Sequence, residues 1–349
     1  MSSWAALFLF SLLTGITILY CAFQLYPAGT RFVSRNRALV QDDSSRDFIP
    51  NPVQQQRLNY LRHFCQAKRK KDGGTSLRTF IQQRFLEREQ KGHIFVSRVL
   101  PVLYCAVPKV ASTNWKRMLL LFDGIKSNIS EMGVKSKVHT QRGLRPLYHV
   151  KGHAMPKVIK DSFKFMFVRH PFERLASAYR NKFADNNTYF EKTYGSRILK
   201  MFRKDLSKEE YNRGRGATFQ EFVRWIVQVE PYDPHWYPAT KLCHPCQIRY
   251  NFIGKMESLL RDAKEVVRRV DSVHKFPKTW TDGYKVSSND LMFDLFSTLD
   301  EKDILGIYKY YKEDFDAFDY GLPRIQHSYN NKNNLLLRTL KKILNGKLT

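Results

Sequence analysis

The stretch that decides the fold is "YCAVPKVASTNWKRMLLLF", residues 104–122. It begins as an apolar run, breaks at a Pro-Lys pair, passes three small residues and resumes with a helical pattern. Residues 165–183, "FMFVRHPFERLASAYRNKF", repeat this order, with Arg169 after the apolar run and Pro171 suited to a first helical turn. Because strands alternate with helices, the sequence predicts an α/β domain with a central parallel sheet flanked by helices.

Both turns have the composition of anion sites. In an open α/β sheet, the loop after a strand lies at the ligand crevice, and the next helix begins with a partial positive charge. Lys109 precedes that helix, and Ser112 and Thr113 add hydroxyl donors. An ordinary strand-turn-helix connection is the alternative for this loop. Arg169 offers a planar fork for phosphate oxygens, or else it pairs with Glu173. Two such turns predict a ligand with two separated anionic groups.

The first turn is not a Walker A loop. The glycines of that motif are missing, and the lysine comes before the small residues rather than after them. A kinase-like P-loop enzyme is therefore disfavoured.

The N-terminus has the composition of a membrane helix. Residues 4–26 contain no charged side chain, and 23 helical residues span a hydrocarbon core of about 30 Å. The apolar region of a cleaved signal peptide is shorter, about 7 to 15 residues. Three arginines after the span favour a cytoplasmic main domain, whereas the glycosylation sequons at Asn128 and Asn186 have meaning only in a lumenal one.

Charge and cysteines narrow the partners and the compartment. The 349 residues carry a net charge of +27, which implies attraction to a polyanion or an anionic surface. Besides Cys21 in the apolar span, the chain has Cys65, Cys105, Cys243 and Cys246, enough for two disulfides in an oxidising compartment. "CHPC" alone is at most half a zinc site, so disulfide bonding that involves Cys65 or Cys105 is favoured.

These motifs resemble those of one enzyme family. "YCAVPKVASTNWKR" resembles the 5'-phosphosulfate loop of Golgi carbohydrate sulfotransferases (sulfotransferase family 2), and "FVRHPFERLASAYRNKF" is similar to their 3'-phosphate motif. The branch in question contains the chondroitin, dermatan and N-acetylgalactosamine 4-O-sulfotransferases and the glucuronyl 3-O-sulfotransferase. The likeness continues through His235 and Trp236, "LCHPCQIRYNFIGKMESL" and "YKEDFDAFDYGLP", so it covers residues 99–323.

The resemblance implies a P-loop-like sulfotransferase fold and 3'-phosphoadenosine 5'-phosphosulfate (PAPS) as sulfate donor, with no metal. Lys109 would stabilise the bridging oxygen as the S–O bond breaks, and Arg169 and Ser177 would hold the 3'-phosphate. The implied phosphosulfate loop comprises Pro108, Lys109, Val110, Ala111, Ser112, Thr113 and Asn114. The implied 3'-phosphate motif comprises Arg169, His170, Pro171, Phe172, Glu173, Arg174, Leu175, Ala176 and Ser177.

Two residues depart from the pattern of this branch. Ser112 stands where cysteine is usual, which keeps a small donor. His170 stands where Asp or Glu is usual, which removes a carboxylate beside Arg169.

Sulfate transfer needs a base for the acceptor hydroxyl, and histidine can accept a proton near neutral pH. His139 and His235 are the two candidates, because both stand where the branch has a histidine. Weaker candidates are His149, His153 and His244.

The sequence and this resemblance together predict an enzyme that transfers sulfate from PAPS to position 4 of N-acetylgalactosamine in chondroitin, dermatan or N-glycans. The alternatives are 3-O-sulfation of terminal glucuronic acid and a non-catalytic, membrane-anchored polyanion-binding protein. Nucleic acid is disfavoured as a partner, since no recognised nucleic-acid motif occurs. A Golgi enzyme of type II orientation would have a cytoplasmic tail at 1–3, a membrane helix at 4–26, a lumenal stem at 27–98, a catalytic domain at 99–323 and a basic tail at 324–349.

Overall fold

The computed structural model describes residues 51–74, 76, 77, 79, 81, 92–129, 132, 143–271, 273–277, 288–321 and 335–344. The chain divides into two units, Met1–Ile49 and Pro50–Thr349, and all described residues belong to the second. The predicted tail at 1–3 and membrane helix at 4–26 lie outside the described residues. Within the described part, no helix is both long enough and apolar enough to cross a membrane.

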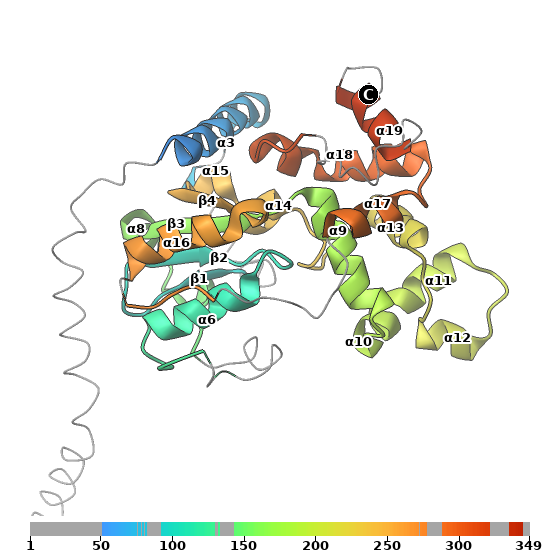
Figure 1. Ribbon diagram of the computed structural model, residues 1–349, viewed down its shortest axis with the longest axis horizontal. Coiled ribbons are helices and arrows are strands. Elements are labelled where there is room, and N and C mark those ends of the chain that lie inside the picture. Colours follow the sequence, from blue (N-terminus) through green and yellow to red (C-terminus); the bar gives the residue numbers. More distant parts are fainter. Residues whose placement is uncertain are drawn as a thin grey trace, which may run out of the picture. The chain divides into compact units, whose positions relative to one another are not determined.

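The described part of the chain contains a four-stranded sheet in the order β1-β2-β3-β4 (Figure 1). Its strands are β1 (Ile94–Val96), β2 (Val102–Cys105), β3 (Phe163–Val168) and β4 (Phe252–Lys255). Strands β2, β3 and β4 are parallel, which confirms the predicted parallel sheet, but β1 is antiparallel to β2. Only residues 97–101 separate β1 from β2, too few for the crossover that a parallel pair requires. The chain therefore turns back and forms an antiparallel edge.

Because β2, β3 and β4 are parallel, their carboxyl ends lie at the same edge of the sheet. Each of these strands is followed by a helix. Helix α6 (Ser112–Phe122) follows β2, α9 (Pro171–Tyr179) follows β3, and η5 (Met256–Ser258) with α16 (Leu259–Val270) follows β4. The other described helices are α3 (Pro52–Asp72), η2 (Leu147–His149), α8 (Met155–Asp161), η3 (Arg180–Ala184), α10 (Thr188–Phe190), η4 (Glu191–Gly195), α11 (Ser196–Phe202), α12 (Lys208–Arg213), α13 (Phe219–Val229), α14 (Ala239–Cys243), α15 (Pro245–Ile248), α17 (Ser288–Phe296), α18 (Glu301–Ala317) and α19 (Leu335–Leu344).

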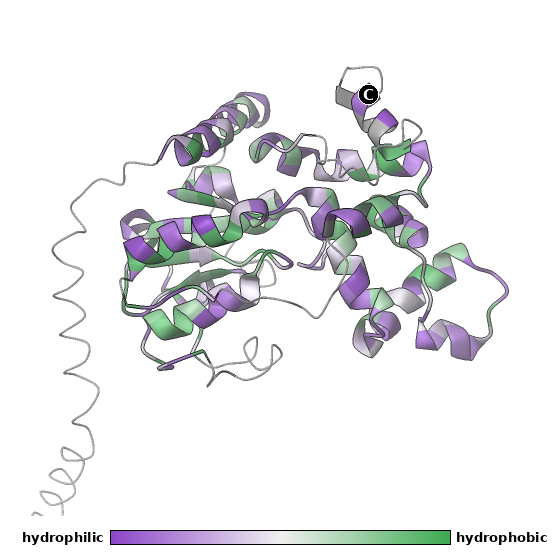
Figure 2. Ribbon diagram, viewed as in Figure 1, coloured by the Kyte–Doolittle hydropathy of each residue, from purple (hydrophilic) through white to green (hydrophobic). Residues whose placement is uncertain are grey.

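Aromatic side chains hold α6 against the sheet. The Trp115 ring of α6 lies 4.7 Å from that of Phe165 and 4.9 Å from that of Phe167, measured between ring centroids. Strand β4 can lie beside β3 only because residue 254 is glycine: a Cβ there would come within 2.2 Å of the Phe167 ring. The hydrophobic colouring of the strands in Figure 2 matches this burial.

Helix α9 carries the chain from the sheet into a second, helical core. Phe172 of α9 stacks on Phe296 of α17 at 4.5 Å and meets Phe315 of α18 edge-on at 5.1 Å. Trp236, which is fully buried, packs against Tyr194 and Phe222. The residues just before α14 are thereby anchored in this core.

Helix α3 closes the outer edge of the sheet. The Gln54 side chain donates to the Ile253 carbonyl and accepts from the Ile253 amide, both at 3.1 Å, so it occupies the hydrogen bonds that a fifth strand would make. Arg57 forms a buried ion pair with Asp262 of α16 at 2.6 Å. The predicted stem at 27–98 thus contains α3 and β1, and both pack with the domain that was expected to begin at residue 99.

The predicted basic tail at 324–349 contains helix α19. Leu336 and Thr339 are buried, and Lys342 Nζ lies 2.7 Å from Glu301 Oε1 of α18. Within this segment, the helix extends over Leu335–Leu344.

Two disulfides use all four cysteines of the described residues. Cys65 of α3 bonds to Cys246 of α15, and Cys105 at the end of β2 bonds to Cys243 at the end of α14. The prediction that "CHPC" takes part in disulfide bonding that involves Cys65 or Cys105 is confirmed, and the structure pairs both of them. Each bond joins segments more than 100 residues apart in the sequence, so each constrains the unfolded chain strongly.

Replacing Cys105 and Cys243 together by serine is expected to lower the free energy of unfolding by about 4 kcal/mol, the loss of chain entropy for so long a loop. Urea unfolding of the variant and the parent protein measures it. With reductant present the two proteins should unfold together, and coincident transitions under oxidising conditions would contradict the expectation. Non-reducing peptide mapping should recover Cys65 with Cys246.

Candidate active site

The loop between β2 and α6 is tightly wound. Lys109 and Ala111 have φ of 69° and 54°, in the left-handed region that side chains other than glycine seldom occupy. Val110 between them is fully buried, and α6 begins directly afterwards at Ser112. The backbone therefore turns sharply and brings Lys109 to the start of a helix, where the N–H groups favour an anion.

The second predicted anion site lies beside the first. Arg169 follows β3, is almost fully buried, and its Nη1 donates to the Lys109 carbonyl at 3.3 Å. Its Nε is 3.4 Å from Glu173 Oε2 one helical turn on, so the pairing considered from the sequence is present. Arg169 thus contacts both the phosphosulfate loop and the first turn of α9.

His170 faces the protein interior. Its ring meets those of Phe172, Phe315 and Tyr320 edge-on, and its Nε2 is 3.3 Å from the Gly321 carbonyl. Burial lowers the pKa of His170 to about 4, so the ring is neutral at neutral pH. The backbone N–H of His170 donates to Glu257 Oε1 at 3.0 Å. Glu257 therefore supplies a carboxylate near the position where the family branch has Asp or Glu.

His235 forms a pair with Asp233. Asp233 Oδ1 accepts from the His235 ring Nδ1 at 2.7 Å and from the His235 amide at 2.9 Å, while Tyr194 donates to Asp233 Oδ2 at 3.1 Å. With Nδ1 as the donor, Nε2 carries the lone pair. Burial lowers the pKa of His235, Asp233 opposes this by raising it, and the charges of Lys182 and Lys109 lower it again. The outcome is a neutral imidazole whose free nitrogen can accept a proton.

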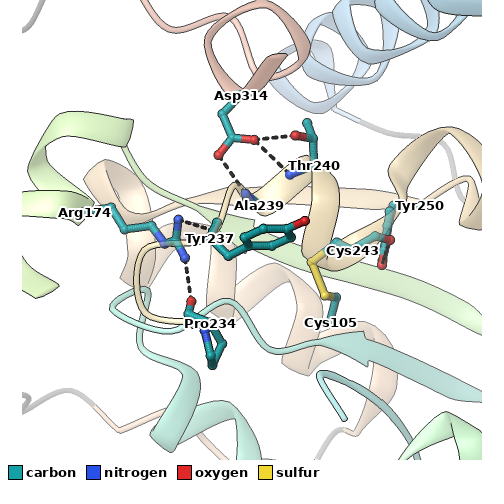
Figure 3. The surroundings of a disulfide bond; sticks show 9 residues. All are labelled: Cys105, Arg174, Pro234, Tyr237, Ala239, Thr240, Cys243, Tyr250 and Asp314. Atoms are coloured by element: carbon teal, nitrogen blue, oxygen red, sulfur yellow. Dashed lines mark hydrogen bonds between the residues drawn. A yellow bond between two sulfur atoms is a disulfide. The ribbon is translucent and has the colours of Figure 1, made fainter. Parts of the chain in front are cut away.

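A buried arginine joins the phosphosulfate loop to the His235 segment. Arg174 of α9 is 2% exposed, and its guanidinium donates to the carbonyls of Pro108 at 3.1 Å, Pro234 at 2.8 Å and Tyr237 at 2.9 Å. Figure 3 shows the arms that reach Pro234 and Tyr237. One side chain therefore fixes the spacing between the loop that begins at Pro108 and the segment on either side of His235.

Helix α14 is held at both of its ends (Figure 3). Asp314 of α18 accepts from the amides of Ala239 and Thr240 at 2.7 and 2.8 Å, which satisfies the first turn of the helix. At the other end, Cys243 is bonded to Cys105, three residues before Pro108, the first residue of the implied phosphosulfate loop. The covalent bond and Arg174 thus connect the same two segments.

The structure brings Lys109, Arg169, Arg174 and His235 together, but other predicted residues lie elsewhere. His139 is outside the described residues. His149 stacks edge-on against Tyr148, His153 is exposed, and His244 stands between the two disulfide cysteines. Both sequon asparagines are exposed. In the part of the chain that is described, no three His, Cys, Asp or Glu side chains are grouped to hold a metal.

Sequence reasoning missed several charged neighbours of His235. Asp233 was not selected, although it lies only two residues before His235 in "DPHW". Lys182 was missed because it lies five residues after Ser177, the last residue of the implied 3'-phosphate motif. Lys116 and His93 were missed too; burial and the charges of Lys116 and His235 lower the pKa of His93 to about 4, and burial lowers that of Lys116 to about 8.

Comparison with known proteins identifies the family of the chain. A model of the sulfotransferase family matches residues 92–321. The chain belongs to the sulfotransferase family. Carbohydrate sulfotransferase 11 of Rattus norvegicus is 34% identical over 254 residues, covering 69% of this chain and 71% of that protein. Carbohydrate sulfotransferase 14 of Danio rerio is 33% identical over 299 residues, covering 84% and 78%. Carbohydrate sulfotransferase 8 of Mus musculus is 31% identical over 279 residues, covering 78% and 64%. No solved structure gives a significant match.

Family membership makes this sulfotransferase an enzyme that transfers sulfate, and it implies PAPS as the donor. The residues at the loop fit such an anion. Asn114, in the first turn of α6, is completely buried, and its Nδ2 finds no acceptor among the described residues. Buried donors of this kind usually have a partner, and phosphate or sulfate oxygens are suitable acceptors.

Replacing Arg174 by alanine is expected to lower the free energy of unfolding by about 3 kcal/mol or more, because three partly buried carbonyls lose their donor. Chemical unfolding of the full-length chain measures this loss. Arg213→Ala is the matched control, since the Arg213 side chain is 67% exposed and its loss should cost at most about 0.5 kcal/mol. Equal losses for the two variants would contradict the role of Arg174.

Proposed function

We propose that this sulfotransferase transfers sulfate from PAPS to a glycan hydroxyl, with position 4 of N-acetylgalactosamine in chondroitin, dermatan or N-glycans as the acceptor. The observation that carries the proposal is the pairing of Asp233 with His235 next to the Lys109 loop. The relatives are named carbohydrate sulfotransferases, which supports a sugar acceptor. The motif resemblance supports the 4-hydroxyl, with 3-O-sulfation of glucuronic acid as the alternative.

The two loops divide the recognition of PAPS. The phosphosulfate would lie against residues 108–114, where Lys109 and the start of α6 stabilise negative charge, and the 3'-phosphate would lie near Arg169 and Ser177. Within the 3'-phosphate motif, Phe172, Leu175 and Ala176 are fully buried and support the motif from behind. Arg174 also has a structural role in this proposal, because its three described hydrogen bonds go to backbone carbonyls.

The protein's own groups carry out the transfer. His235 Nε2 removes the proton of the acceptor hydroxyl as the new O–S bond forms, and Asp233 stabilises the imidazolium that results. Lys109 stabilises the charge that develops on the phosphate oxygen as its bond to sulfur breaks. The fixed spacing of the two segments sets the in-line geometry of the attacking and leaving oxygens. His139 stays as the second candidate base.

Charge, disulfides and sequons support a lumenal Golgi enzyme in type II orientation. Two disulfides suit an oxidising compartment, and exposed Asn128 and Asn186 are accessible to glycosylation. The net charge of +27 attracts an anionic donor and an anionic polymer. The membrane helix at 4–26 completes this proposal.

The full-length chain, incubated with labelled PAPS and a panel of desulfated glycans, should label chondroitin or dermatan or terminal N-acetylgalactosamine, and digestion to disaccharides should place the sulfate at position 4. Lys109→Ala should lower kcat/KM by about 10²- to 10³-fold, as expected for loss of a group that stabilises transition-state charge. Lys151→Ala, which removes an exposed lysine, is the control. Undiminished activity of Lys109→Ala would reject the mechanism, and sulfate found only on glucuronic acid would favour the alternative acceptor.

The pH profile identifies the base. A base must be unprotonated, so kcat/KM rises with pH through the pKa of His235, and the lowered pKa puts this acidic limb below pH 6.5. His235→Ala should lower kcat by about 10²- to 10⁴-fold and remove that limb. If His235→Ala keeps the limb and His139→Ala loses it, His139 is the base instead.

A further inference from the structure

Lys182 lies near His235 and outside the two implied donor-binding motifs, residues 108–114 and 169–177. Its Nζ is 4.2 Å from the centre of the Phe190 ring, and the Phe190 ring meets the His235 ring edge-on at 5.3 Å. The Phe190 ring thus contacts both the ammonium group and the imidazole. The Lys182 charge is close enough to act on the pKa of His235.

Local structure builds this arrangement. Lys182 lies in the π-helical turn η3, which follows α9, and turns of this kind often occur at functional sites. Phe183 next to it is buried against Tyr179 and Phe222, which fixes the turn. Asn187 caps α10 by accepting a hydrogen bond from the Phe190 amide. The Phe190 ring, over which the Lys182 ammonium group lies, is therefore also held in place.

The Lys182 ammonium group shares the only carboxylate that acts on it with other described residues. The acidic group whose charge acts on it is Asp233, and the two oxygens of Asp233 already accept bonds from His235 and Tyr194. Among the described residues, Lys182 has no ion pair within 4.0 Å. A partly buried cation in this position favours an anion from outside the chain.

Helix α9 separates Lys182 from the proposed position of the donor's 3'-phosphate. Arg169 lies before the first residue of α9 and Lys182 after the last, and nine helical residues span about 13 Å. His235, which Lys182 does approach, is where the acceptor hydroxyl has to be deprotonated. The anion that suits Lys182 is therefore one on the acceptor.

We propose that Lys182 binds the carboxylate of a hexuronic acid next to the sugar that receives the sulfate, and so selects uronic-acid polymers over neutral glycans. This inference rests on the proposed function. It assigns Lys182 to acceptor binding rather than to the reacting atoms, so its loss acts on the KM for the acceptor.

The test compares desulfated chondroitin with the same polymer after its carboxyl groups have been reduced to alcohols. Lys182→Ala should raise the KM for chondroitin about 10- to 100-fold, as expected for a lost charge-assisted hydrogen bond. The assays are run well above pH 6.5, where His235 is unprotonated with or without the Lys182 charge. Under these conditions the KM for PAPS, kcat, and the KM for the reduced polymer should change less than about twofold. Lys182→Arg should restore most of the affinity for chondroitin.

Lys192→Ala is the matched control, because Lys192 is an exposed lysine in the second π-helical turn, η4. It should leave both polymers unaffected. Parent enzyme with the same KM for both polymers would overturn the inference alone, as would a Lys182→Ala variant with equal losses on both or with reduced kcat. Parent enzyme that sulfates neither these polymers nor any other glycan would overturn the proposed function itself. If Lys182→Ala does not fold, the comparison of the two polymers with the parent enzyme and Lys182→Arg decides.

Discussion

The site depends on one constraint, the fixed spacing between the loop after β2 and the segment before α14. Arg174 sets it from inside the protein by donating to the carbonyls of Pro108, Pro234 and Tyr237. A charged group this deeply buried is costly unless its donors are satisfied, and a planar fork can satisfy three carbonyls that a lysine ammonium could not reach together. The Cys105–Cys243 disulfide repeats the connection covalently. Displacement in line requires donor and base to be held at a set distance, and these two links hold the segments that carry them.

The electrostatics of His235 come from competing contributions. Burial and two lysine charges disfavour the imidazolium, while Asp233 favours it, and the net result is a lowered pKa. A neutral ring is what a base needs before the reaction. In the proposed mechanism Asp233 matters more afterwards, because the proton taken from a hydroxyl turns the ring into a cation beside a carboxylate that is already in place. The same pair fixes which nitrogen is free, so protonation state and orientation have one structural origin.

The sequence predicted the strand-turn-helix segments that contain β2 with α6 and β3 with α9, because apolar runs followed by helical patterns are local signals. It did not predict α3 as part of the domain, since that helix is held by Gln54, Arg57 and a disulfide rather than by an apolar stripe. Lys109 and His235 were selected from motifs. The partners of Arg174 could not be, because they are backbone carbonyls brought together only by the fold.

The strained backbone of the loop after β2 depends on the rigid elements that surround it. Lys109 and Ala111 occupy left-handed backbone conformations without being glycines, a cost of about 1 to 3 kcal/mol each that only well-determined surroundings can maintain. Three contacts hold the loop in this conformation. Arg169 donates to the Lys109 carbonyl and Arg174 donates to the Pro108 carbonyl. Just upstream, the disulfide of Cys105 fixes the end of β2. A Walker loop reaches a comparable turn with glycines, which pass between conformations freely. Here the turn is made from residues with side chains and is held by bonds from neighbouring elements, so the position of the lysine is set before any anion arrives, and less ordering remains to be done when one binds.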